Sequence, residues 1–339
     1  MGPGSSHGFA MLARDDRWLA GRHDGRMAND IEIGPAYAPA PEFTVRPDVP
    51  VGAVRPFTME SRSSKHYPGI RRIENEVTRR RDAWGNRIAA AEHEQSEPYP
   101  YVRTVWVYVP VQYRRGTPAP FMVVQDGYGY LNRLPRVLDN LIAEGRVPPM
   151  IAVLVDSGGG DAQGSQRGLE YDTLSGAYSD FIETEVLPNV VWQTDVTLSE
   201  DPDMRATMGA SSGAACAFTM AWEHPERYRK VLSYSGTYVN QQSPPDPARP
   251  RGAWEYHATI LPNAPNKPLR IWMEVGEKDL HHDDPEESWH NWPLANRRMA
   301  AVLAAKGYDY RFVFSKGARH VDPRVTEETL PGALEWLWR

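Results

Sequence analysis

Apolar residues along most of this chain fall into short runs that alternate with segments of helical periodicity. From residue 102 onward, runs rich in β-branched and aromatic residues, such as 102–109 (VRTVWVYV), are typical of strands. The continuous apolar runs at 121–124 and 150–155 are typical of strands that are buried on both faces of a parallel sheet. Further strands are expected at 205–208, 230–234, 269–275 and 310–314.

Segments with apolar residues at helical spacing separate these strands. Helices are expected at 134–144, 178–187, 213–223, 292–306 and 326–338, and Pro188 is expected to end the second of them. Strands that alternate with helices predict a parallel sheet wound by right-handed crossovers. We therefore expect an α/β fold with a single domain over residues 55–339, in which a Pro-rich insertion spans about 240–268.

The first 54 residues lack such a pattern. They mix Gly, Pro, Ala and charged residues without a sustained apolar period, so 1–54 is expected to be an extended or poorly ordered N-terminal segment. Residues 1–26 are left out of the fold prediction. Neither a signal peptide nor an apolar run near the roughly 20 residues of a membrane span is visible, so a cytoplasmic protein without membrane contact is expected.

Charge and cysteine content narrow the function classes. Among 339 residues, 44 acidic and 38 basic side chains give a net charge of −6, which disfavours a nucleic-acid partner. A single cysteine, Cys216, excludes a disulfide framework and a cysteine-based zinc site. The His-rich segment 281–290 lacks helical i, i+4 pairing of ligands, so it is interpreted as a solvated loop. No metal and no cofactor is expected.

The segment 209–213 (GASSG) has the pattern Gly-x-Ser-x-Gly. It follows the strand at 205–208 and opens a helix whose first turns are small residues, which is the context of a nucleophile elbow. Ser211 is therefore the predicted nucleophile. Ser212 is a rival, but its backbone N–H suits the oxyanion hole, which uses the residue after the nucleophile.

Three stretches resemble one protein family. Residues 208–236 (MGASSGAACAFTMAWEHPERYRKVLSYSG) are similar to the nucleophile region of the enterochelin-esterase-like and esterase-D-like branch of the α/β-hydrolases. Residues 105–127 (VWVYVPVQYRRGTPAPFMVVQDG) and 167–188 (RGLEYDTLSGAYSDFIETEVLP) resemble other parts of the same family. The resemblance covers about 100–339. It implies an α/β-hydrolase fold, a mostly parallel central sheet with helices on both faces, and a Ser–Asp–His triad.

The resemblance also implies where the acid and the base of this triad lie. His320 follows the last strand and precedes the last helix, where the family places its histidine. Asp279 lies just past the strand at 269–275, where the family's acid falls, and Glu277 is the alternative acid. A serine hydroxyl needs such a base, and the base needs an orienting acid.

The loop 125–130 (QDGYGY) is expected to supply the second oxyanion donor, and the resemblance favours the N–H of Tyr128, with that of Gly127 as the alternative. Several aromatic residues lie in segments that should overhang the site. The expected substrate-binding residues are Tyr128, Tyr238, Trp254, Trp289 and Trp292. Together they favour an aromatic or sugar-bearing ester over a long-chain lipid.

The sequence thus predicts a serine carboxylic-ester hydrolase that forms an acyl-enzyme on Ser211. Its partner is expected to be a small-molecule ester of the feruloyl, acetyl or siderophore type. Two alternatives stay open: acyl transfer, as in the mycolyltransferase relatives of this fold, and a non-catalytic binding protein that kept the fold. Whether the chain forms a homodimer is also left open.

Overall fold

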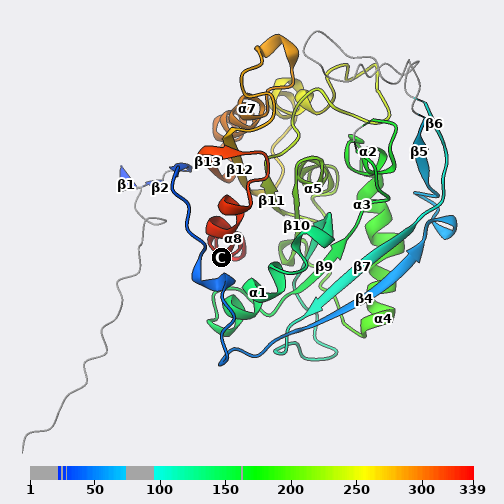
Figure 1. Ribbon diagram of the computed structural model, residues 1–339, viewed down its shortest axis with the longest axis vertical. Helices are drawn as coiled ribbons and strands as arrows, with labels where there is room; N and C mark the ends of the chain where they lie inside the picture. The colour runs from blue at the N-terminus through cyan, green and yellow to red at the C-terminus, as the bar shows by residue number, and fades with distance from the viewer. Residues whose placement is uncertain (1–21, 24–25, 28, 74–94, 162) are drawn as a thin grey trace, which may run out of the picture.

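A computed structural model describes residues 22–23, 26–27, 29–73, 95–161 and 163–339. A nine-stranded sheet runs through its centre (Figure 1). In spatial order the strands are β3 (Asp30–Ile33), β13 (Asp309–Arg319), β12 (Arg270–Lys278), β11 (Lys230–Tyr234), β10 (Arg205–Ala210), β8 (Phe121–Gln125), β9 (Ile151–Val155), β7 (Val102–Val109) and β4 (Ala53–Glu60). Two-stranded sheets join β1 (Arg22–His23) to β2 (Arg26–Met27), and β5 (Ile70–Arg72) to β6 (Ser96–Pro98).

The sheet is mostly parallel, as the apolar runs predict. Only β7 is antiparallel to its neighbours β9 and β4. Every residue of β8 and of β9 is buried, which is why these strands read as continuous apolar runs.

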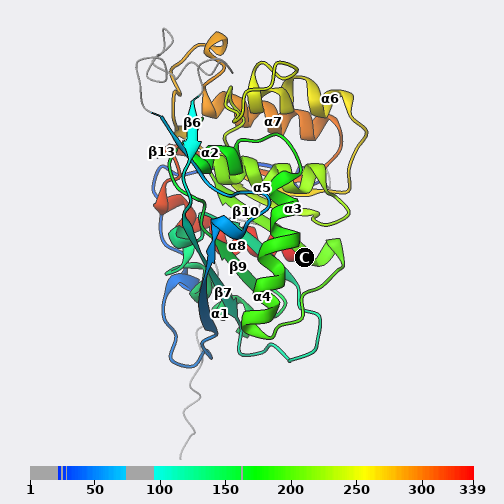
Figure 2. The same cartoon turned by 90° about the vertical axis from the view of Figure 1, so that its right-hand side faces the viewer.

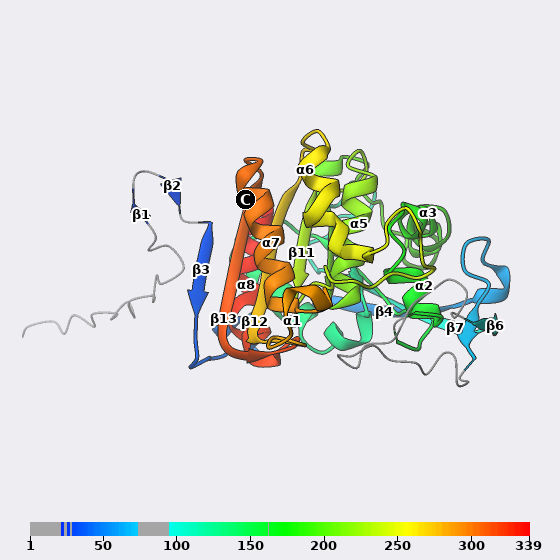
Figure 3. The ribbon, with the colours of Figure 1, turned by 90° about the horizontal axis from the view of Figure 1, so that it is seen from above.

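Helices cover both faces of the sheet (Figure 3). One apolar cluster lies under α2, α3, α5 and α7, and the other lies under α1 and α8. The helices are α1 (Leu134–Ala143), α2 (Gln166–Tyr171), α3 (Ala177–Phe181), α4 (Leu187–Thr194), α5 (Ser212–Glu223), α6 (Leu261–Asn263), α7 (Trp292–Ala305) and α8 (Pro323–Trp338). The expected helices therefore all form.

The prediction that Pro188 ends a helix was wrong. A π-helical turn at Ile182–Val186 joins α3 to α4, and Figure 2 shows them as one continuous rod that ends at Thr194. Proline cannot donate a backbone hydrogen bond, and it disturbs the regular α-helical pattern before it. The wider π turn accommodates that disturbance, so the helix continues.

The sheet also extends beyond the predicted strands. Strand β13 runs to Arg319, five residues past the end of the predicted strand at 310–314. Strand β3 lies within the N-terminal segment expected to be extended or poorly ordered, and it pairs in parallel with β13. Most of residues 1–26 lie outside the described residues. Within the described residues, none of the helices has the length and apolar character needed to cross a membrane.

Candidate active site

Ser211 lies in a sharp turn between β10 and α5. Its backbone has φ 57° and ψ −128°, a conformation that costs a non-glycine residue roughly 1–3 kcal/mol. A Cβ atom on Gly209 would lie 2.3 Å from the carbonyl of Gly213. Gly209 is needed because the strand and the helix approach too closely here for a side chain, and a Cβ atom on Gly213 would be a tight fit at 3.1 Å from Gln125 Cβ. The turn presents the half-buried Ser211 at the carboxyl edge of the sheet.

The pairing of β12 with β13 brings the predicted acid and base together. Its last paired residues are Lys278 and Arg319, so Asp279 and His320 both follow directly after that pair. The Asp279 Oδ1 atom lies 2.5 Å from His320 Nδ1. The His320 Nε2 atom lies 3.0 Å from Ser211 Oγ. The imidazole thus bridges the carboxylate and the hydroxyl in the order that a catalytic triad requires.

The surroundings fix this arrangement. The Asp279 side chain is fully buried, and the N–H of Leu280 donates to its Oδ1 at 2.6 Å. The ring of Trp292 packs edge-to-face against His320, with 6.0 Å between the ring centroids. The His320 side chain remains 23% exposed, so a substrate can reach the imidazole and the serine but not the carboxylate.

Glu277, the alternative acid, has a different set of contacts. Its carboxylate accepts the N–H of Gly317 at 2.8 Å and lies 3.4 Å from Lys316 Nζ. The Gly317 N–H bond, with the lysine charge, holds the pKa of Glu277 below its usual value. Glu277 therefore tethers β13 a few residues before His320 and has no contact with the imidazole among its described hydrogen bonds.

The candidate oxyanion donors differ in availability. Ser212 is the first residue of α5, and its N–H has no intrahelical acceptor, as expected for a helix N-terminus. The N–H of Tyr128 donates to Asp156 Oδ1 at 2.9 Å, so this amide is already occupied. The N–H of Gly127 has no acceptor among the described residues. Gly127 lies so close to the backbone of Leu154 that only glycine fits.

Other contacts hold the loop that carries these amides. Asp126 adopts a left-handed conformation with φ 52°. Its carboxylate pairs with the Arg167 guanidinium through bonds of 2.8 to 3.2 Å, and its N–H donates to the Tyr171 hydroxyl at 3.0 Å. Burial is the main cause that raises the pKa of Asp156. The sequence analysis missed Arg167 and Asp156, although Asp156 directly follows the apolar run of β9.

The aromatic residues predicted to bind substrate separate into two groups. Tyr238 is fully buried, with its hydroxyl 2.9 Å from Ser233 Oγ, and Trp254 is 1% exposed. Neither offers a surface to a substrate, because both pack into the core around α5 and α7. Tyr128 and Trp289 are 69% and 37% exposed, whereas Trp292 is only 5% exposed and packs on His320.

The His-rich segment is held by its own contacts. His281 Nδ1 lies 2.9 Å from Asp284 Oδ2, and the His281 ring stacks on Trp292. No group of three His, Cys, Asp or Glu side chains in the described part of the chain is placed to hold a metal ion.

A second buried carboxyl group lies close to the triad. Glu274, on β12, is 2% exposed. Burial raises its pKa to about 8, and the nearby carboxylates of Asp279 and Asp322 act in the same direction. Glu274 is therefore neutral at pH 7, which avoids a further buried negative charge beside Asp279.

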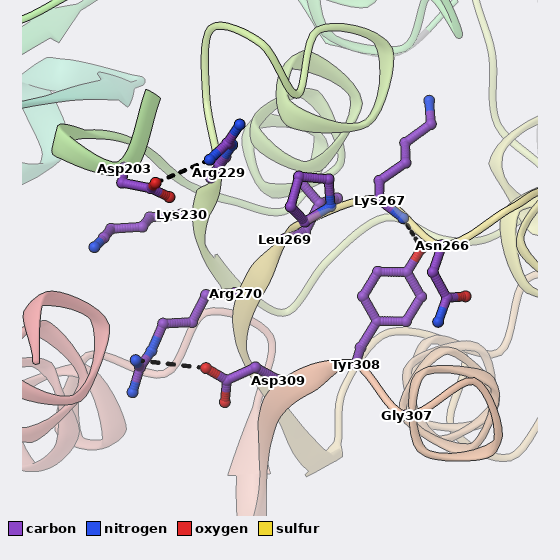
Figure 4. A pocket seen from close by; sticks show the side chains of 11 residues that line it. Asp203, Arg229, Lys230, Asn266, Lys267, Leu269, Arg270, Gly307, Tyr308 and Asp309 are labelled. Atoms are coloured by element: carbon purple, nitrogen blue, oxygen red, sulfur yellow. Dashed lines mark hydrogen bonds and ion pairs between the residues drawn. The ribbon is translucent and has the colours of Figure 1, made fainter. Parts of the chain in front are cut away.

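A cavity of about 450 Å³ lies at the amino-terminal ends of the strands, the end of the sheet away from Ser211 (Figure 4). Lys230 and Arg270, the first residues of β11 and β12, line it. Their cationic groups lie over the rings of Trp338 and Trp336 on α8, and Arg270 pairs with Asp309 at 3.4 Å. The basic side chains thus help α8 to pack against the sheet. None of Ser211, Asp279 and His320 lines this cavity.

The family model described as "Putative esterase" matches residues 96–323. The chain belongs to this esterase family. It is 26% identical over 146 residues to the iron(III) enterobactin esterase of Dickeya dadantii (strain 3937), a match that covers 42% of this chain and 32% of that protein.

Solved structures of esterases share the fold. The enterobactin esterase from Shigella flexneri is 22% identical with a TM-score of 0.54, over 74% of this chain and 57% of that chain. A mutant of the feruloyl esterase module from Clostridium thermocellum is 16% identical with a TM-score of 0.54, over 89% and 94% of the two chains. The expected α/β-hydrolase fold is confirmed. The chain spans about a third of the Dickeya relative and just over half of the Shigella chain.

Proposed function

We propose that this protein is a serine carboxylic-ester hydrolase that acts on small-molecule esters through an acyl-enzyme on Ser211. The observation that carries the proposal is the bridging imidazole of His320, 3.0 Å from the Ser211 hydroxyl and 2.5 Å from the buried Asp279 carboxylate. The strained turn at Ser211 and membership of the esterase family support the same chemistry.

In this mechanism, Ser211 Oγ attacks the ester carbonyl while His320 Nε2 accepts the hydroxyl proton. Asp279 accepts the Nδ1–H bond, which keeps the proton-accepting nitrogen directed at the serine and stabilises the imidazolium. The tetrahedral intermediate then collapses, and the alcohol leaves with the proton from His320. A water molecule, activated by the same imidazole, hydrolyses the acyl-enzyme.

The developing oxyanion is stabilised by backbone amides. The Ser212 N–H lies at the N-terminus of α5, where the helix dipole favours negative charge. In the loop after β8, the Gly127 N–H has no acceptor among the described residues, whereas Asp156 occupies the N–H of Tyr128. We therefore assign Ser212 and Gly127 as donors and Tyr128 as a residue that Asp156 holds in place.

The proposed substrate class is supported by exposed apolar side chains that lie close in the chain to the candidate oxyanion loop and to Asp279. Tyr128, Leu280 and Trp289 are 69%, 41% and 37% exposed. They favour an ester with an aromatic or sugar-linked group, because aromatic side chains stack on flat or weakly polar faces. The Shigella enzyme was solved with 2,3-dihydroxy-N-benzoyl-serine and the Clostridium module with sinapinate, both aromatic acids, which supports an aromatic acyl group.

Hydrolysis rates over a panel of p-nitrophenyl esters and methyl ferulate test the proposal. We expect turnover by the wild-type protein and loss of nearly all of it in Ser211→Ala, with the cooperative unfolding transition retained. Adding a sugar acceptor tests the transferase alternative, which predicts a sugar ester at the expense of the free acid. Wild-type protein that hydrolyses no member of the panel would contradict the proposal.

A further inference from the structure

Three side chains behind the elbow form a polar network that the mechanism above does not use. Ser212 is 1% exposed, so its hydroxyl cannot meet the substrate. Gln241 Nε2 donates to Ser212 Oγ at 3.0 Å and to Asp172 Oδ2 at 2.8 Å. One amide group therefore connects the residue after the nucleophile to a buried carboxylate.

The network is held from the Pro-rich insertion. The Gln241 N–H donates to Val239 O at 2.7 Å, and Ala253 N–H donates to Gln241 O at 3.1 Å. Gly252, with φ 52°, lies so close to the Gln241 backbone that a Cβ atom would approach it to 2.6 Å. Gln241 is thus fixed in position before it reaches Ser212.

Asp172 anchors the other side of the network. It is 5% exposed, and its backbone carbonyl accepts the N–H of Ser243 at 3.1 Å. Burial raises the pKa of Asp172 to about 6, although Arg167 and the bonds from Gln241 and Ser212 lower it. A buried carboxylate with these donors makes stronger hydrogen bonds than a neutral acceptor would.

We infer that Gln241 and Asp172 are positioning residues that fix the Ser211–Ser212 peptide, and so orient the Ser212 amide as an oxyanion donor. This inference rests on the proposed function. An oxyanion donor is effective because it is already aimed at the position of the developing charge. Without the bond from Gln241, the Ser211–Ser212 peptide has more freedom to rotate, and the Ser212 N–H points less consistently at the oxyanion. The insertion at 240–268 therefore contributes to catalysis through Gln241.

The test compares two adjacent substitutions. Gln241→Met removes the network donor. Gln242→Met is the control, because Gln242 is the next residue of the same insertion, is buried, and donates its own side-chain bond to Arg249 O at 2.8 Å. We expect Gln241→Met to lower kcat about tenfold with KM changed less than twofold, and to slow phosphonylation by a fluorophosphonate probe equally. Gln242→Met should retain the wild-type kcat.

A second variant keeps the test valid if Gln241→Met folds poorly. Ser212→Ala removes the acceptor, so it should lower kcat by a similar factor, and adding Gln241→Met to it should cause no further loss. Equal losses of kcat in Gln241→Met and Gln242→Met, or no loss in either, would overturn the inference. Those results would leave the proposed function intact, whereas an inactive wild-type protein would overturn the proposed function.

Discussion

Replacing the triad acid tests the proposed mechanism at its most buried point. Asp279→Asn keeps the size of the side chain and removes its charge. In the structure Asp279 Oδ1 accepts bonds from both His320 Nδ1 and the Leu280 N–H, while Oδ2 is buried with no hydrogen-bond partner among the described residues. An asparagine must therefore either bury an unpaired NH₂ group or turn that donor towards His320.

Both orientations harm catalysis. In the first, the imidazolium that forms in the transition state loses its buried counter-charge, a loss of about 4 kcal/mol if it resembles other broken buried pairs. In the second, the amide donor faces Nδ1 and forces the wrong tautomer. At about 1.4 kcal/mol per tenfold change, we expect kcat to fall roughly 10³-fold or more.

The assay is kcat and KM for p-nitrophenyl acetate, with thermal unfolding to verify the fold. Glu277→Gln is the control, because it removes a charge two residues earlier from a group that contacts Gly317 and Lys316 instead of His320. We expect a change below about threefold in Glu277→Gln. A normal rate in Asp279→Asn with a collapse in Glu277→Gln would assign the acid to Glu277. Near-normal rates in both would refute the triad.

Two further predictions concern other carboxyl groups. Asp156→Ala should lower kcat about tenfold, because Asp156 holds the oxyanion loop through the Tyr128 N–H; a faster rate would show that Tyr128 is the donor and that Asp156 blocks it. Folding raises the pKa of Glu274 from 4.5 to about 8, so its protonated form stabilises the folded state. This contribution is complete below pH 4.5 and is lost as the pH rises to about 8. Over this window the free energy of unfolding should fall by roughly 1.4 kcal/mol per pH unit. Urea unfolding should therefore show that Glu274→Gln is less sensitive to pH over this window than the wild type, and parallel pH profiles would contradict the assignment.

The fold and the turn that carries Ser211 could be predicted because local signals encode them. The strand at 102–109 and the buried runs in β8 and β9 have the composition of strands, and the glycines around Ser211 mark a close approach of backbone. The family resemblance, and not a local signal, pointed to Asp279 and His320, which the register of β12 and β13 brings together.

What the sequence could not predict depends on contacts between distant segments. Gln241 meets Asp172 and Ser212 across 69 and 29 residues, and no local pattern marks such a pair. Tyr238 and Trp254 were expected to bind substrate because they lie in segments that should overhang the site, but both side chains pack into the core and are buried. Aromatic character alone does not separate a core residue from a binding residue.

The central claim is that Ser211 is a nucleophile activated by His320. A fluorophosphonate probe reacts covalently with such a serine, and peptide mass spectrometry identifies the labelled residue. The account predicts a single adduct on Ser211 in the wild-type protein, slowed by several orders of magnitude in His320→Ala and absent in Ser211→Ala. An unlabelled wild-type protein, or an adduct on Ser212 that persists in Ser211→Ala, would contradict it.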